Sequence, residues 1–187
     1  MEVRRTSNAE AIKKMLAELE KKEIRVGFFE NSKYTDGTPI AYVAAIQEFG
    51  YGPIPPRPFM RPAEEANKGK WLKGIAAGVR GVIAGNVTLD HALEQVGMVA
   101  AGDVRKAIKA VTAPPLSPLT LLLRKRAKGN DAAPITGKSV GQAARDLAME
   151  GPRQKGDKTL DVSGVSTKPL VDTSQMLQAV NSAVVTT

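Results

Sequence analysis

Cysteine is absent from this chain of 187 residues, and His91 is its only histidine. Disulfide bonds and cysteine ligands for metals are therefore excluded, and the remaining donors are too few for an ordinary zinc site. Aromatic residues make up only 4% of the chain, whereas hydrophobic residues make up 42%. A core of ordinary size must therefore consist mostly of alanine, valine and leucine.

Long apolar runs are also missing. No stretch of about 18 apolar residues occurs, so we expect no transmembrane helix and no membrane partner. The first residues, "MEVRRTSNAEAIKKM", carry charges where a signal peptide needs an apolar segment. These patterns predict a soluble protein made in the cytoplasm.

Catalytic motifs are equally scarce. No GxxxxGK[ST] or GxGxxG motif occurs, and "GNDAAPITGKS" (129–139) lacks the first glycine of a phosphate-binding loop. Ser7, Ser117 and Asp172 stand at positions typical of helix caps, and no base is available to activate a nucleophile. We expect no enzyme, cofactor or metal; an enzyme would have to depend on an acid such as Asp161.

Hydrophobic periodicity predicts several helices and two short strands. Strands are expected over 23–30, where apolar residues alternate with Arg25 and Gly27, and near 182–187. Helices are expected over 8–22, 39–49, 62–83, 86–111, 118–128 and 139–150, with a last one capped by Asp172 or Thr173. Residues 1–128 and 168–187 form the expected core, and 129–167 form an extended arm or insertion, because this segment has few core residues.

The formal charge of +8 permits contact with nucleic acid or with an acidic protein surface. Basic residues cluster at 68–73, 105–109 and 124–128, and Trp71 is the only aromatic residue among them. Arg124, Lys125 and Arg126 are therefore candidates for a DNA-facing surface. Solvated helix faces explain the same clusters, so both interpretations stay open.

One short stretch, "IPPRPFMRPA" (54–63), combines four prolines with two arginines. With the preceding "YVAAIQEFGYGP" it resembles the signature of a tailed-bacteriophage neck family, whose members are tail-completion, minor tail and virion morphogenesis proteins. "PPLSPLTLLLRK" (114–125) and "KPLVDTSQMLQAV" (168–180) resemble two later family motifs, although Ser174 replaces the usual glycine. The residues that match the signature are Glu48, Phe49, Gly50, Pro55, Arg57, Pro58, Phe59, Met60, Arg61, Pro62 and Ala63. Asp172 and Thr173 match the last motif.

This resemblance implies a small α+β subunit, with a small antiparallel sheet packed with several helices. It also implies a structural virion protein at the head–tail junction. Its subunits would form a homo-oligomeric ring, expected to be a hexamer, that completes or terminates the tail and docks it to the head. The implied partners are head connector or head-closure proteins, tail-tube proteins and the genomic DNA in the lumen. A basic nucleic-acid-binding protein is the alternative.

Within the ring interpretation, the strip at 54–63 has two possible roles. Its prolines favour an extended crossing between two helices, with Pro62 starting the second helix and Phe59 and Met60 anchoring the crossing. Arg57 and Arg61 then either make hydrogen bonds across a subunit interface or hold a structural corner within one subunit.

Overall fold

Two long antiparallel helices form the centre of the computed structural model, which describes residues 2–128, 136–149, 164–172 and 174–187, with side chains from residue 9 onward. Helix α3 spans Met60–Ile83 and helix α4 spans Leu89–Ala110. Small residues let the two backbones approach closely, because a Cβ atom at Gly78 would lie 3.0 Å from Cβ of Ala92. The glycines that weaken α3 as a helix therefore help it to pack, as expected.

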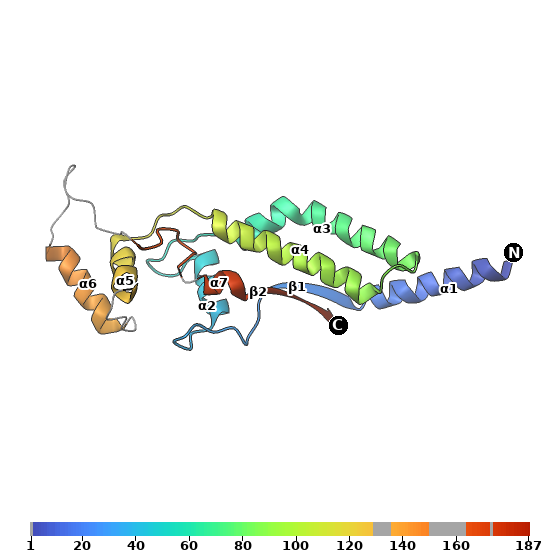
Figure 1. The fold of residues 1–187 in the computed structure, drawn as a ribbon, viewed down its shortest axis with the longest axis horizontal. Coiled ribbons are helices and arrows are strands. Elements are labelled where there is room, and N and C mark those ends of the chain that lie inside the picture. The colour runs from blue at the N-terminus through green and yellow to red at the C-terminus, as the bar shows by residue number, and fades with distance from the viewer. Residues whose placement is uncertain (1, 129–135, 150–163, 173) are drawn as a thin grey trace.

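A two-stranded antiparallel sheet lies against α4 (Figure 1). Strand β1 (Lys22–Phe28) pairs with β2 (Val180–Thr186), with Ile24 opposite Val184 and Phe28 opposite Val180. The predicted strands are thus confirmed, with β2 starting earlier than expected. The chain has an α+β fold, in which the N-terminal and C-terminal parts of the sequence meet in one small sheet.

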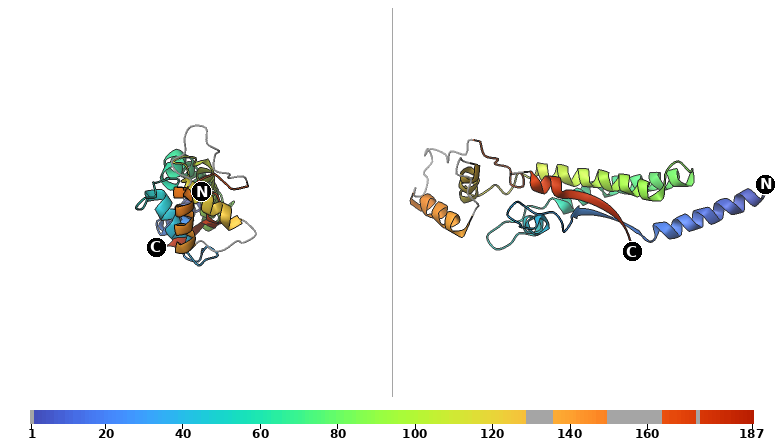
Figure 2. Two further views of the ribbon diagram at one scale, coloured as in Figure 1. Left: turned by 90° about the vertical axis from the view of Figure 1, so that its left-hand side faces the viewer. Right: turned by 60° about the horizontal axis from the view of Figure 1, so that its bottom comes forward.

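Helix α1 (Glu2–Leu19) leads into β1 and extends beyond the end of the sheet (Figures 1 and 2). Ser7 lies inside this helix, so it does not cap the start that the sequence predicted at residue 8. Met15 is buried, whereas Leu16 beside it is 45% exposed. Only part of α1 therefore rests on the rest of the molecule.

Helix α2 (Ile40–Phe49) and the short helix α7 (Gln175–Ala179) close the core at the other end of the sheet. The final helix is much shorter than its apolar residues predicted, because the chain enters β2 at Val180. The fully buried side chains include Phe59, Ile108 and Val180. Alanine, valine and leucine dominate the core as expected, and Phe59 is its large exception.

Helices α5 (Pro118–Lys128) and α6 (Gly137–Met149) form a separate pair at the end of the molecule opposite α1 (Figures 1 and 2). The Ser117 hydroxyl accepts a hydrogen bond from the backbone N–H of Thr120 at 3.2 Å, so the predicted cap of α5 is confirmed. Helix α6 confirms the short helix predicted within the arm. The sequence analysis placed residues 118–128 in the same core as the two long helices. Helix α5 packs instead against α6.

Candidate functional site: a buried corner with an exposed aromatic surface

Glu48, near the end of α2, caps the N-terminus of α3. Its Oε2 atom accepts hydrogen bonds from the backbone N–H groups of Phe59 at 2.7 Å and Met60 at 2.9 Å. Its Oε1 atom accepts from the backbone N–H of Arg61 at 3.2 Å and from Arg61 Nε at 2.9 Å. Arg61 Nη2 also donates to the backbone carbonyl of Glu48 at 3.1 Å. One carboxylate therefore satisfies donors that a helix start otherwise leaves without partners.

The electrostatics of Glu48 follow from these contacts. Burial alone would raise the pKa of its carboxyl group, but the backbone N–H groups of Phe59 and Met60 and the Arg61 guanidinium favour the charged form. The pKa therefore lies below its ordinary value. Glu48 stays ionised at neutral pH and complements the positive end of the α3 dipole.

Arg57 holds the strip to the segment that follows α4. Its Nε donates to the carbonyl of Pro114 at 2.8 Å and its Nη2 to the carbonyl of Pro115 at 3.0 Å. Its Nη1 donates to Oε1 of Gln47 at 3.2 Å, and its backbone N–H donates to the carbonyl of Gln47 at 2.6 Å. Burial lowers the pKa of Arg57 from its usual value, with no carboxylate among these partners. These contacts within one chain favour the structural-corner interpretation of Arg57.

Phe59 anchors the corner in the core. Its side chain is 1% exposed, and its ring meets that of Phe28 edge to face, with centroids 6.1 Å apart and planes at 87°. Helix α3 begins at Met60, so Pro62 lies within its first turn rather than at its start. Proline is tolerated there because the first N–H groups of a helix have no intrahelical acceptor. Pro55 and Pro58 are exposed and lie outside any helix or strand.

The outward side of the corner carries exposed aromatic residues. Phe49 is 68% exposed and Tyr51 is 69% exposed, and the guanidinium carbon of Arg61 lies 5.1 Å from the centroid of the Phe49 ring. Tyr42 and Ile54 are exposed as well, and we call these four side chains the aromatic surface. A chain with few aromatic residues thus exposes several of them on α2 and in the segment that follows it, which is typical of a contact surface.

Gly50 shapes this surface. It ends α2 with φ of 79°, a left-handed conformation that favours glycine. An added Cβ atom would also lie 3.1 Å from the carbonyl oxygen of Ile54 and from the ring of Pro56. The Glu-Phe-Gly sequence at 48–50 therefore provides a buried cap, an exposed ring and a tight turn in consecutive positions.

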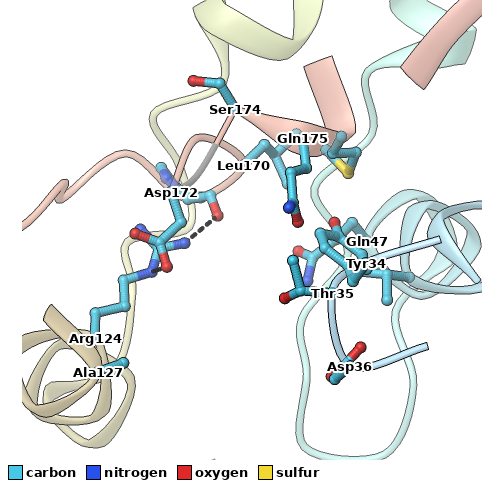
Figure 3. Close-up of a pocket in the computed structure, with 13 residues that line it drawn as sticks. Tyr34, Thr35, Asp36, Gln47, Arg124, Ala127, Leu170, Asp172, Ser174 and Gln175 are labelled. Carbon is cyan, nitrogen blue, oxygen red and sulfur yellow. Dashed lines mark hydrogen bonds and ion pairs between the residues drawn. The ribbon is translucent and has the colours of Figure 1, made fainter. Parts of the chain in front are cut away.

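A pocket of about 440 Å³ lies between α2, α5, the loop at 34–36 and the segments 169–172 and 174–176 (Figure 3). Figure 3 shows Arg124 and Asp172 on one side, and Tyr34, Thr35 and Gln47 on the other. Burial raises the pKa of the Tyr34 hydroxyl, and the carboxylates of Asp36 and Asp172 raise it further. Tyr34 therefore stays protonated and can donate a hydrogen bond, and the carboxylates of Asp36 and Asp172 line the same pocket.

Arg124, a predicted DNA-facing residue, is turned toward the protein instead. Its side chain is 11% exposed and lies 3.3 Å from the Asp172 carboxylate. It donates to the backbone carbonyls of Ser166 at 2.8 Å, Lys168 at 2.9 Å and Pro169 at 3.1 Å. Arg124 therefore joins α5 to the segment before α7, and the prediction that it faces DNA is wrong.

The other two predicted DNA-facing residues differ from Arg124. Arg126 is exposed and forms an ion pair with Asp146 of α6 at 2.5 Å. Lys125 is partly exposed and also has a partner. The three basic side chains at 124–126 thus have partners within the chain, and they do not form one continuous basic surface.

The C-terminal motif also differs from its prediction. Asp172 pairs with Arg124 and does not cap α7, and Thr173 lies outside the described residues. Ser174 occupies the position before α7, and its side chain makes no capping hydrogen bond. Its φ of 61° is left-handed, a conformation that glycine adopts more readily than serine.

One buried charged group was not identified from the sequence. Asp103 on α4 accepts hydrogen bonds from Lys70 Nζ at 2.5 Å and Trp71 Nε1 at 2.9 Å, and Lys106 Nζ lies 3.5 Å away. Burial would raise the Asp103 pKa, but these donors outweigh it and hold the pKa below its usual value. The sequence feature that could have identified Asp103 is its position, because it is an acidic residue on the same side of α4 as the buried Ala100 and Val104.

The remaining chemistry is sparse in the part of the chain that the structure describes. His91 is on the surface, with Nε2 3.0 Å from Nε2 of Gln95. No group of side chains there could hold a metal ion, and no helix there is long and apolar enough to cross a bilayer. Asp161, the acid proposed for an enzyme, lies outside that part. Comparisons of the chain with protein-family models, with curated proteins and with solved structures give no match.

Proposed function

We propose that this protein is a structural component of a tailed-phage virion. It forms a ring at the head–tail junction, completes or terminates the tail, and docks it to the head connector. The observation that carries this proposal is the corner formed by Glu48, Arg57 and Arg61. The segment that resembles the neck family combines the buried, hydrogen-bonded Glu48 and Arg57 with the exposed aromatic surface beside them.

The distribution of exposed apolar side chains supports a subunit that is completed by its neighbours. Besides the aromatic surface, Leu16 on α1 and Leu72 on α3 are about half exposed. These residues lie on different elements, so pairs of unlike surfaces can meet between copies. Contacts of this kind close into rings when the rotation between subunits is a whole fraction of a turn.

Nucleic-acid binding is the weaker alternative. It needs cations that face solvent together, yet Arg124 is largely buried and Arg126 is paired with Asp146. That alternative predicts strong, salt-dependent DNA binding by the free subunit. Our proposal predicts that binding is weak and that an Arg126→Ala substitution changes it little.

Light scattering and electron microscopy of the purified protein test the proposal. We expect a ring that forms as the concentration rises, or on mixing with tail tubes if the free subunit is monomeric. A protein that stays monomeric under both conditions and is missing from phage particles would overturn the proposal.

A further inference from the structure

Helix α1 has an outward side with apolar residues that its own chain leaves uncovered. Ile12 and Leu16 are one helical turn apart, and Glu20 follows another turn later, directly after the helix. Leu16 is 45% exposed and Ile12 is partly exposed. The helix extends past the end of the sheet (Figures 1 and 2), so this side lies beyond the core of its own subunit.

A groove of about 420 Å³ lies between β1, α3 and α4. Its apolar lining includes Ile24 of β1, Val96 and Ala100 of α4, and Leu72 and Ile75 of α3. Leu72 is 58% exposed, and Lys68 lies on the same wall one turn before it. We call this the sheet-side groove. It is the size of a few side chains, and the charged residues Arg61, Glu64 and Lys68 line one end of its α3 wall.

We propose that α1 of one copy docks in the sheet-side groove of a second copy. This inference rests on the proposed ring and names one of its contacts. The two helices match in an antiparallel arrangement, in which Leu16 meets Leu72 and Ile12 meets Ile75. Glu20 then lies opposite Lys68, so the register pairs charges of opposite sign as well as apolar residues.

The direction of α1 distinguishes a second copy from the same chain. The chain ends α1 at Leu19 and starts β1 at Lys22, and Gly27 of β1 lies beside Met60 at the start of α3. If α1 folded back along its own β1, it would therefore run parallel to α3 and not antiparallel to it. The antiparallel register belongs to a contact between copies. It joins two unlike surfaces, as a closed ring requires.

The absence of cysteine makes disulfide trapping a clean test. A chain carrying Leu16→Cys is mixed with a chain carrying Leu72→Cys and oxidised, and disulfide-linked dimers are measured by electrophoresis without reductant. Because each chain has one thiol, a bond between the two positions must join two copies, with Cα atoms within about 7 Å. We expect this pair to cross-link in much higher yield than the control, which combines Leu16→Cys with Met98→Cys on an exposed position of α4.

The outcomes separate the docking contact from the proposed function. Equal yields for the two pairs, or no cross-link in a protein that light scattering shows to be oligomeric, would overturn the docking contact and leave the ring intact. A doubly substituted chain that forms its disulfide only internally would also overturn it. Specific cross-linking in a protein that never enters phage particles would support the contact and overturn the proposed function.

Discussion

Glu48 shows how a single side chain can organise a helix start from a distance in sequence. The sequence predicted a helix beginning at Pro62. The helix begins at Met60 instead, and the carboxylate at its N-terminus comes from α2. A negative charge does lie at the N-terminus of α3, as the helix dipole favours, but a side chain of α2 supplies it.

Replacing Glu48 with glutamine should destabilise the protein and change its response to acid. We expect a loss of about 2–4 kcal/mol in the free energy of unfolding at pH 7, because buried donors lose a charged acceptor. The folded-state pKa of Glu48 is lowered, so its contribution is complete above the unfolded-state value of about 4.3 and is lost as the pH falls through the lower folded-state value. Urea unfolding should therefore show the difference between the two proteins shrinking below about pH 4.

A matched control is Glu65→Gln, which removes an exposed carboxylate from the same helix. Its effect should stay within about 0.5 kcal/mol at every pH. If Glu48→Gln behaved like Glu65→Gln, the cap would not stabilise the start of α3.

Arg57 should behave as part of the fold of the subunit. Arg57→Ala leaves the carbonyls of Pro114 and Pro115 without their donors, and we expect it to lower the free energy of unfolding by about 3 kcal/mol. Arg57→Lys should recover less than half of this loss, because an ammonium group cannot reproduce the planar fork. Urea unfolding of the monomer measures both values. An Arg57→Ala variant with unchanged stability but failed assembly would instead restore the subunit-interface interpretation.

At the level of elements, the packing of α4 on the sheet depends on Gly97. A Cβ atom there would lie 3.0 Å from Cβ of Ser182 and 3.2 Å from Cγ2 of Ile24. Gly102 lies on the same helix, but a Cβ atom there would meet nothing within 4 Å. Two glycines in one helix thus have opposite expected roles.

Alanine substitutions at these positions should move stability in opposite directions. Gly97→Ala should cost about 1–3 kcal/mol through overpacking against β1 and β2. Gly102→Ala should stabilise the protein by up to about 1 kcal/mol, because alanine favours the helix and nothing obstructs it. Thermal unfolding of the two variants beside the unmodified protein checks both signs, and a stabilising Gly97→Ala would contradict the packing of α4 on the sheet.

Elements with strong local patterns could be predicted from the sequence. The amphipathic stripe of α4, the alternation in β1 and the Ser117 cap of α5 all have local causes. The last helix could not be delimited, because Met176 and Leu177 suit a helix while the pairing of β2 with β1 ends it at Ala179. The pairing of the two strands, and not the local helix propensity, therefore determines where α7 ends.

The candidate site was predicted only in part. The sequence identified the residues of the corner and the role of Phe59 as an anchor. The partners of Arg57, at Pro114 and Pro115, and those of Arg124, at Ser166 to Pro169, are backbone carbonyls far along the chain. Every residue has a backbone carbonyl, so no sequence pattern indicates which carbonyl accepts such a hydrogen bond.

On the scale of the whole molecule, two arginine side chains connect the parts of an elongated subunit. Arg57 ties the corner to the segment leading toward α5, and Arg124 ties α5 to the segment returning toward α7. The α5–α6 pair is therefore held to the core through both chain connections. Helix α1 extends from the other end, so surfaces suited to contacts with neighbours are present along the molecule.

The most direct test of the neck-protein account is to inactivate this gene in a phage that carries it and to examine the lysate by electron microscopy. The account predicts filled heads and separate tails that do not join, with joining restored when the protein is supplied in trans. Normal numbers of complete particles without the protein would contradict it.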